Sequence, residues 1–195
     1  MYVRNKKAWH RLIYDLLYPA LLGSMLYNIF SPSTVSWNYV GQVVVVCIYL
    51  VDYLYLYTDW MDQGYPNRLL EVFGDGLVAI LYRLSFGFIA ARPTLASICL
   101  GLVFFLYLFY EIAQHRVTRI FILASVFVML LNILFNFLSD NNQQKTFVVA
   151  AFIEFLLLAF FVFYYAPKQI TPREPDVESL PSESADAYDA ANPDR

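Results

Sequence analysis

Four acidic side chains lie inside apolar stretches of this chain, where a charge is costly to bury. They are Asp15, Asp52, Asp75 and Glu111, and each falls in a different stretch. At a helical rise of about 1.5 Å per residue, each lies about 4–8 Å inside the same boundary of the apolar layer. Carboxylates at one depth can bind a cation, relay protons, or hold a divalent metal for work on a lipid headgroup. The simpler alternative is that each acid reaches the interface alone or pairs with a nearby arginine.

A second set of polar residues lies deeper in the apolar stretches: Arg83, Asn132 and Glu154. Arg83 is about 18 Å from one boundary, and Glu154 is about 12 Å from the other, at the level of Asn132. In an apolar layer of about 30 Å these depths coincide. We therefore expect Arg83 to pair with Glu154 and Asn132 to hydrogen-bond beside them. Such a pair either fixes helix packing or acts as a gate.

No catalytic or cofactor motif accompanies these residues. The sequence has no phosphate-binding P-loop, no zinc-protease H-E-x-x-H pair and no G-x-S-x-G nucleophile elbow. Cys47 and Cys99 lie in apolar stretches, and no CxxC or Cys/His cluster suggests a disulfide framework or a zinc site. We predict no catalytic residue and no cofactor. Whether the carboxylates bind a metal ion is left open.

The elements that position these residues are apolar runs long enough to cross a bilayer. Hydrophobic residues form 59% of the chain and charged residues 15%, against about 45–50% and about 25% in soluble domains. A lone strand cannot satisfy its backbone polar groups in lipid, so the runs are predicted to be helices. The predicted fold is an all-α, polytopic transmembrane bundle of six spans, at 12–30, 39–57, 72–90, 95–114, 120–138 and 146–166.

The basic residues predict the orientation of these spans, because Lys and Arg concentrate in cytoplasmic loops. One side of a six-span arrangement carries Arg4, Lys6, Lys7, Arg11, Arg68, Arg116, Arg119, Lys168 and Arg173. The other side carries Arg92 and Lys145. The span at 72–90 is the weakest, since it holds Asp75 and Arg83, but deleting it would erode this bias. Both termini are therefore predicted to be cytoplasmic.

Two regions follow from this map. Residues 1–166 form the six-helix transmembrane domain, and residues 167–195, rich in proline, serine and acidic residues, are predicted to be a disordered acidic cytoplasmic tail. The 17 phenylalanines and 16 tyrosines are compatible with lipid-facing and packing surfaces. The expected location is the cell membrane, of the bacterial cytoplasmic type, with the lipid bilayer, a second copy or another membrane protein as partner, and no nucleic acid.

Three functions fit these features, and the sequence leans away from an enzyme. The first is a small transporter or channel for a cation or small solute, with Asp15, Asp52, Asp75 and Glu111 as its vestibule. Arg83, Glu154 and Asn132 would then form the gate. The second is a non-catalytic membrane subunit or scaffold that recruits a partner. The third is a lipid-modifying membrane enzyme whose inner carboxylates hold Mg²⁺.

Overall fold

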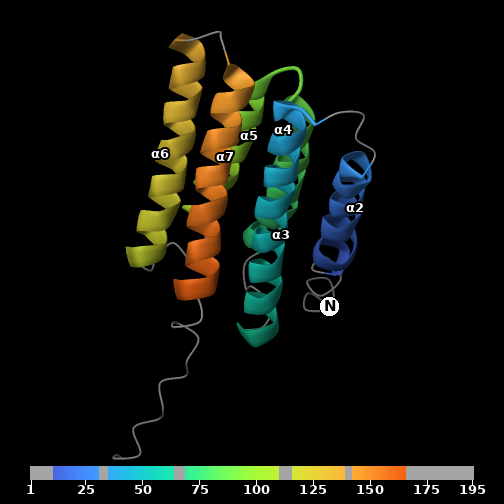
Figure 1. Cartoon of the computed structure of the whole chain (residues 1–195). Coiled ribbons are helices and arrows are strands. Elements are labelled where there is room, and N and C mark those ends of the chain that lie inside the picture. Colours follow the sequence, from blue (N-terminus) through green and yellow to red (C-terminus); the bar gives the residue numbers. More distant parts are fainter. Residues whose placement is uncertain (1–10, 31–34, 64–68, 110–115, 139–141, 166–195) are drawn as a thin grey trace, which may run out of the picture.

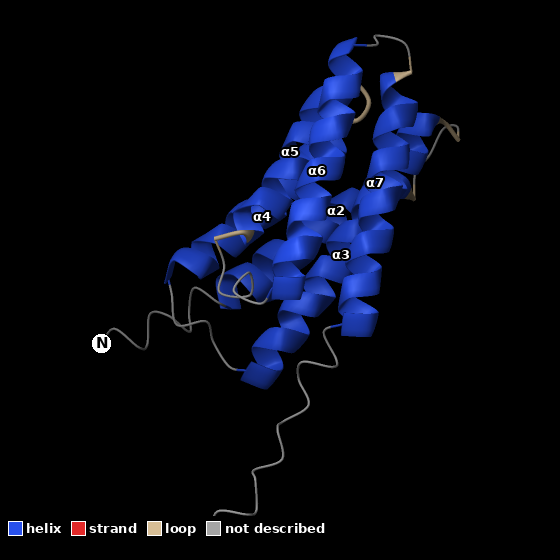
Figure 2. Ribbon diagram, turned by 90° about the vertical axis from the view of Figure 1, so that its left-hand side faces the viewer, coloured by secondary structure: helices blue, strands red, loops and turns tan. Residues whose placement is uncertain are grey.

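The computed structural model describes residues 11–30, 35–63, 69–109, 116–138 and 142–165, and every regular element among them is helical (Figures 1 and 2). In chain order the elements are η1 (Arg11–Leu17), α2 (Tyr18–Ile29), α3 (Trp37–Gln63), α4 (Leu69–Phe88), α5 (Pro93–Tyr107), α6 (Arg116–Leu138), α7 (Gln143–Phe160) and η3 (Phe161–Tyr165). The two η elements are π-helical turns. The predicted all-α class is confirmed for these residues. The predicted tail at 167–195 lies outside them.

Consecutive helices run in opposite directions, so α3, α5 and α7 are parallel to one another (Figure 1). Helix α2 packs on α3 and α4 at one side of the bundle, and α6 packs on α5 and α7 at the other. Helix α7 also packs along α3. We call the end where η1 begins and η3 ends the inner end. The opposite end, which carries Arg92 and Asn142, is the outer end (Figure 1).

Four helical segments are long and apolar enough to cross a membrane: Leu12–Ile29, Trp37–Leu56, Val117–Leu138 and Gln143–Tyr164. They agree with four of the predicted spans to within a few residues. The other two predicted spans correspond to α4, which carries Asp75 and Arg83, and to α5, which has 15 residues. Both are helices in the bundle, but neither is among the segments that meet these criteria of length and apolarity.

The surface of the bundle is apolar where that of a soluble protein would be polar. Helix α6 exposes one stripe at helical spacing: Ile120, Leu123, Phe127, Leu130 and Leu134. Its polar residues Ser125, Asn132 and Asn136 are buried instead. Contiguous exposed apolar stripes of this size are typical of surfaces that face lipid or another helix. The exposed apolar stripe therefore supports the prediction that this chain is a membrane protein.

Two glycines allow helices to approach closely. A Cβ atom at Gly41 of α3 would lie 3.2 Å from side-chain atoms of both Ile89 and Val148. A Cβ atom at Gly101 of α5 would lie 3.2 Å from Cβ of Met129 on α6. Small residues at such positions are how membrane helices pack tightly without a hydrophobic driving force between them. Gly41 thus fixes α3 against α7, and Gly101 fixes α5 against α6.

The π-turn η1 leaves a backbone carbonyl that a tyrosine satisfies. In a π-helix the carbonyl of Tyr14 would accept from residue 19, but Pro19 has no N–H to donate. The hydroxyl of Tyr53 on α3 donates to this carbonyl at 3.4 Å, and that of Tyr49 donates to the carbonyl of Tyr18 at 2.9 Å. Because unpaired backbone groups are costly in an apolar layer, these two bonds attach the first helical segment to α3.

Candidate functional site

Asp52 lies in the interior of the bundle, on α3, and is 2% exposed. Its Oδ2 atom accepts a hydrogen bond of 2.7 Å from the hydroxyl of Tyr107 on α5. Neither α3 nor α5 contains a lysine, arginine or histidine. The recorded hydrogen-bond donor to Asp52 is therefore a neutral phenol, which stabilises a carboxylate but does not balance its charge.

Asp75 brings a second carboxylate to the same region. It lies on α4, is 2% exposed, and its Oδ2 atom accepts a hydrogen bond from the hydroxyl of Tyr14 on η1. Asp75 and Asp52 are close enough for their charges to interact. Two of the four acids predicted to share one depth thus lie within electrostatic range of each other, on two different helices.

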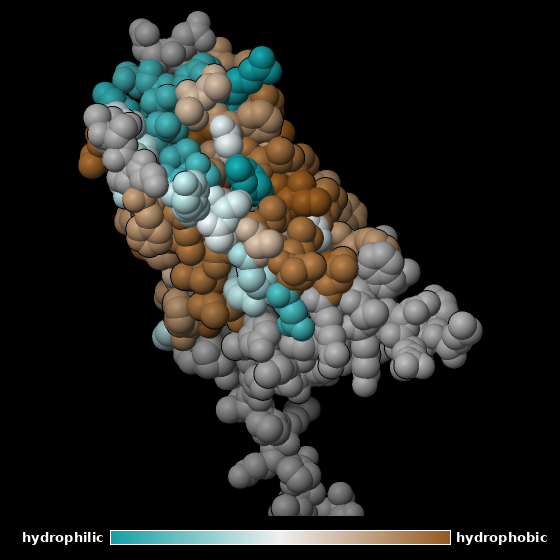
Figure 3. All heavy atoms as spheres, turned by 90° about the vertical axis from the view of Figure 1, so that its right-hand side faces the viewer, coloured by the Kyte–Doolittle hydropathy of each residue, from teal (hydrophilic) through white to brown (hydrophobic). Residues whose placement is uncertain are grey.

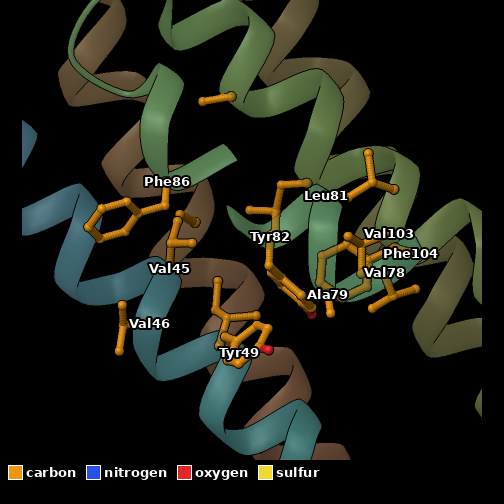
Figure 4. Packing of buried hydrophobic residues seen from close by; sticks show 14 of the residues in the cluster. Val45, Val46, Tyr49, Val78, Ala79, Leu81, Tyr82, Phe86, Val103 and Phe104 are labelled. Carbon is orange, nitrogen blue, oxygen red and sulfur yellow. The ribbon is translucent and has the colours of Figure 1, made fainter. Parts of the chain in front are cut away.

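Tyrosine rings fill the space around these two carboxylates. Tyr18 is fully buried and stacks on Tyr14, Tyr49 and Tyr53, with ring centroids 5.7, 5.3 and 5.4 Å apart. Tyr49 in turn meets the edge of Tyr82 of α4 at 5.3 Å, and Figure 4 shows these two side chains directed toward each other. The carboxylates therefore sit in an aromatic core whose polar groups are phenol hydroxyls.

The other two acids of the predicted vestibule do not join this site in the described structure. Asp15 is exposed on η1, one residue after the buried Tyr14, because successive helical residues point in different directions. Glu111 lies outside the described residues. Within the described ranges no group of three acidic, histidine or cysteine side chains could hold a metal ion.

Arg83 and Glu154, expected to pair, have different surroundings. Arg83 is half-buried, its Nε donates to Ser24 Oγ of α2 at 3.2 Å, and its guanidinium lies 5.5 Å from the ring centre of Phe86. Glu154 is fully buried on α7, and neither of its carboxyl oxygens has a hydrogen-bond partner among the described residues. The expected pair is therefore not formed, although the two residues lie at similar depths.

The rotation of α4 explains this difference. Neighbouring residues of an α-helix point about 100° apart, so α4 can direct only one of Tyr82 and Arg83 toward α7. Tyr82 is the residue within electrostatic range of Glu154, and Arg83 is directed to α2. On the α2 side of the molecule, hydrophilic residues cover the upper end of the face, and weakly polar residues continue from there down between apolar regions (Figure 3). Matching depths therefore did not determine which side chains meet.

Asn132 belongs to a polar ladder near the outer end instead of to the Arg83–Glu154 pair. Its Oδ1 atom lies 2.6 Å from the hydroxyl of Ser97 on α5 and 3.2 Å from the amide nitrogen of Asn136. The hydroxyl of Thr146 on α7 donates to Oδ1 of Asn136 at 2.7 Å. This ladder joins α5, α6 and α7. It matches the usual role of amide side chains between membrane helices.

Sequence reasoning placed Tyr14, Tyr18 and Tyr53 at the level of the carboxylates but missed two further tyrosines of the site, Tyr82 and Tyr107. Tyr82 and Tyr107 were counted with the packing aromatics, yet both are buried; the hydroxyl of Tyr107 donates to Asp52, and Tyr82 lies within electrostatic range of it. A signal was present in the four-residue spacings of Tyr14 with Tyr18 and of Tyr49 with Tyr53, which place each pair on one helical face. A buried tyrosine hydroxyl usually has a hydrogen-bond partner, as that of Tyr107 does, whereas the hydroxyls of Tyr18 and Tyr82 have none among the described residues.

Comparison with known proteins does not identify a functional site in this chain, so the candidate site rests on the geometry described above. No protein-family model matches the chain, and neither the curated proteins nor the solved structures contain a match.

Proposed function

We propose that this chain is a small multi-pass membrane protein that moves a cation or small solute, with Asp52 and Asp75 in its inner vestibule. The observation that carries the proposal is the environment of Asp52, which is buried beside a second carboxylate and hydrogen-bonded to the phenol of Tyr107. A carboxylate in an apolar interior without a basic partner requires a proton or a bound cation. Intramembrane acids of this kind commonly mark ion pathways.

The membrane arrangement that we propose has six spans, with both termini cytoplasmic, in a cell membrane of the bacterial cytoplasmic type. The alternating directions of the helices and the clustering of basic residues in alternate loops support it. This arrangement puts Asp52 and Asp75 in the cytoplasmic half of the bilayer. A vestibule there would open to the cell interior.

Reconstituted liposomes test this function. The purified protein is placed in vesicles loaded with a pH-sensitive dye or a sodium- or potassium-sensitive dye, and a gradient of each ion is imposed in turn. We expect a flux above that of protein-free vesicles. Asp52→Asn should reduce it at least about tenfold, because the neutral amide can neither hold a proton nor attract a cation.

The matched control is Asp15→Asn, which removes an equal charge from an exposed position on η1. This variant should retain the wild-type flux. Equal losses in Asp15→Asn and Asp52→Asn would contradict the assignment of Asp52, and the absence of flux for all three ions would contradict cation transport.

A non-catalytic membrane subunit is the second candidate, and one observation favours it. The apolar stripe of α6 and the exposed Phe152, Leu156 and Phe160 of α7 leave a broad apolar surface along two adjacent helices. A second copy of this chain or another membrane protein could cover it. Cross-linking through single cysteines on the α6 stripe, at Leu123 or Leu130, would detect a partner. A single-chain product in native membranes together with measured ion flux would count against this candidate.

A further inference from the structure

Arg83 of α4 is a cation that has no acidic partner among the described residues. Its side chain is only partly buried. Its recorded contacts are a hydrogen bond of 3.2 Å from Nε to Ser24 Oγ and the ring of Phe86, whose centre lies 5.5 Å from the guanidinium carbon. Neither contact carries a negative charge, and a guanidinium is always charged. A cation at membrane depth is costly unless an anion or the membrane surface compensates it.

The hydrogen bond with Ser24 fixes the guanidinium and leaves its terminal nitrogens for a ligand. The Ser24 hydroxyl donates to the carbonyl of Leu21 at 2.8 Å, so its oxygen is the acceptor for Arg83 Nε. Nη1 and Nη2 have no recorded hydrogen bond to a described residue. Their N–H donors lie in one plane, a geometry that matches two oxygens of a phosphate or a carboxylate. The site therefore suits an oxyanion.

The guanidinium extends toward the outer end of the bundle. A Cβ atom at the exposed Gly87 would lie 3.5 Å from Nη1 of Arg83. Gly87 is about one turn, or about 6 Å, nearer to the outer end than Arg83. Side chains on a helix normally lean toward its N-terminus, which for α4 is at the inner end (Figure 1). Arg83 leans the opposite way, as long basic side chains do when they reach for the membrane surface.

This direction takes the guanidinium close to the headgroup layer at the outer end. Gly87 lies about 5 Å from the outer end of the predicted span at 72–90. Polar groups continue outward on α2, where the exposed amide of Asn28 donates to the carbonyl of Ser24 at 2.7 Å. On this side of the molecule, weakly polar residues lead down from a hydrophilic upper end between apolar regions (Figure 3). A lipid phosphate at the outer end thus has a polar surface along which to reach Arg83.

A second copy of the chain offers no matching carboxylate among the acids whose side chains are described. Asp52, Asp75 and Glu154 are buried, and the exposed Asp15 lies on η1 at the inner end. Arg83 is directed away from that end. These observations favour a phosphate of the surrounding bilayer over a carboxylate of another copy, and basic residues between membrane helices are known to bind lipid headgroups.

We propose that Arg83 and Ser24 form a binding site for the phosphate of a phospholipid, on the surface between α2 and α4 in the leaflet at the outer end. The guanidinium binds two phosphate oxygens through Nη1 and Nη2, and Ser24 positions it through Nε. Gly87 leaves room for the headgroup. The acyl chains lie along Ile80 and Leu84, two exposed apolar side chains of α4 below Gly87. The site requires that α4 lies in the bilayer, but it is independent of the proposed transport function.

Native mass spectrometry of the full chain in detergent tests the site. Phosphatidylglycerol and monogalactosyl diacylglycerol with the same acyl chains are added in turn, and only the first lipid carries a phosphate. We expect phosphatidylglycerol to bind at least about tenfold more tightly, because charge-assisted bidentate hydrogen bonds are stronger than neutral ones. Arg83→Gln should lower its binding to the level of the glycolipid.

Two further variants separate the site from a general effect of charge or of folding. Arg119→Gln removes an equal charge from an exposed position of α6, on the far side of the bundle from α2, and should keep the preference for phosphatidylglycerol. Gly87→Leu keeps every charge and replaces a poor helix former with a good one, so it should fold. Its side chain occupies the space beside Nη1 and should weaken phosphatidylglycerol binding at least about threefold.

Equal binding of the two lipids by the wild-type chain would overturn the proposal, and this comparison needs no variant. Equal losses in Arg119→Gln and Arg83→Gln would reduce the effect to net charge and overturn it as well. Unchanged lipid binding in Arg83→Gln, together with loss of a protein that co-purifies with the wild-type chain, would assign the guanidinium to a carboxylate of a partner helix instead. None of these readouts depends on ion flux, so the site and the transport function succeed or fail separately.

Discussion

The hydroxyl of Tyr107 on α5 donates a hydrogen bond of 2.7 Å to Oδ2 of Asp52 on α3. Both side chains are buried, so water does not replace the bond when it is lost. The two helices approach the same acid from different parts of the sequence, 55 residues apart. The bond therefore has a structural role as well as the role proposed in the vestibule.

Replacing Tyr107 with phenylalanine should lower the free energy of unfolding by about 1–3 kcal/mol, because a buried acceptor loses its donor. Reversible unfolding in a mixed detergent measures the change. Tyr27→Phe is the matched control, since Tyr27 is 76% exposed and surface substitutions usually stay within about 0.5 kcal/mol. Similar losses in both variants would show that the buried bond contributes nothing.

Arg83→Ala and Glu154→Gln should have additive effects on stability, to within about 0.5 kcal/mol, because the two side chains do not meet. Arg83→Ala and Ser24→Ala should instead be coupled by about 0.5 kcal/mol or more, since Arg83 Nε donates to Ser24 Oγ. Two double-mutant cycles under the same unfolding conditions compare these pairs. Strong coupling of Arg83 with Glu154 would restore the pairing that depth alone predicts.

Ser97→Ala and Asn132→Ala should be coupled as well. Hydrogen bonds between membrane helices contribute about 0.6 kcal/mol on average and up to about 1.7, and the Ser97–Asn132 distance of 2.6 Å favours the upper part of this range. A double-mutant cycle gives the value. Asn28→Ala, at an exposed position of α2, is the control and should not couple with Ser97→Ala.

Gly101→Val should destabilise the bundle by about 1–3 kcal/mol through overpacking. A Cβ atom at Gly101 already lies 3.2 Å from Cβ of Met129, and both atoms are held by backbone. Gly23→Val is the control, because nothing lies within 4 Å of a Cβ atom at Gly23. Thermal unfolding in detergent should separate the two variants, and equal midpoints would argue against a close α5–α6 contact.

Cysteine labelling distinguishes six spans from four. In a background without Cys47 and Cys99, a cysteine at position 92 should react with a membrane-impermeant thiol reagent added to intact cells, if α4 and α5 both cross the membrane. A cysteine at position 145 should react in either arrangement, and one at position 63 only after permeabilisation. Protection of position 92 together with labelling of position 145 would mean that α4 and α5 do not span.

The sequence predicted the helical segments well because the mean hydropathy of a segment depends only on its own residues and not on how the helices pack. The four apolar segments found in the structure lie within a few residues of the predicted spans. The remaining two, α4 and α5, were also predicted as helices, and the structure forms both. Their status as spans is still a prediction, because Asp75 and Arg83 reduce the apolarity of α4 and because α5 is short.

The site was only partly predictable, since depth gives one coordinate of a side chain and helix rotation gives another. Depth placed Asp52 and Asp75 at one level, and in the structure they lie within electrostatic range of each other. Depth also matched Arg83 to Glu154, but α4 directs Tyr82 to that side. Asp15 was assigned to the vestibule on depth and is exposed. Rotation depends on tertiary packing, such as the close contacts at Gly41, which no single-helix pattern reveals.

The hydrogen bond between Thr146 and Asn136 bears on how the chain is made. Helices α6 and α7 form a hairpin whose amide and hydroxyl groups satisfy one another near its tip, so a translocon could release the two helices to the bilayer as one unit. The polar groups of α6 and α7 would then be hydrogen-bonded to one another before either helix contacts acyl chains. Glu154, whose carboxyl oxygens have no hydrogen-bond partner among the described residues, would enter as the neutral acid and be enclosed when the hairpin packs on α3 and α5, which are synthesised before it.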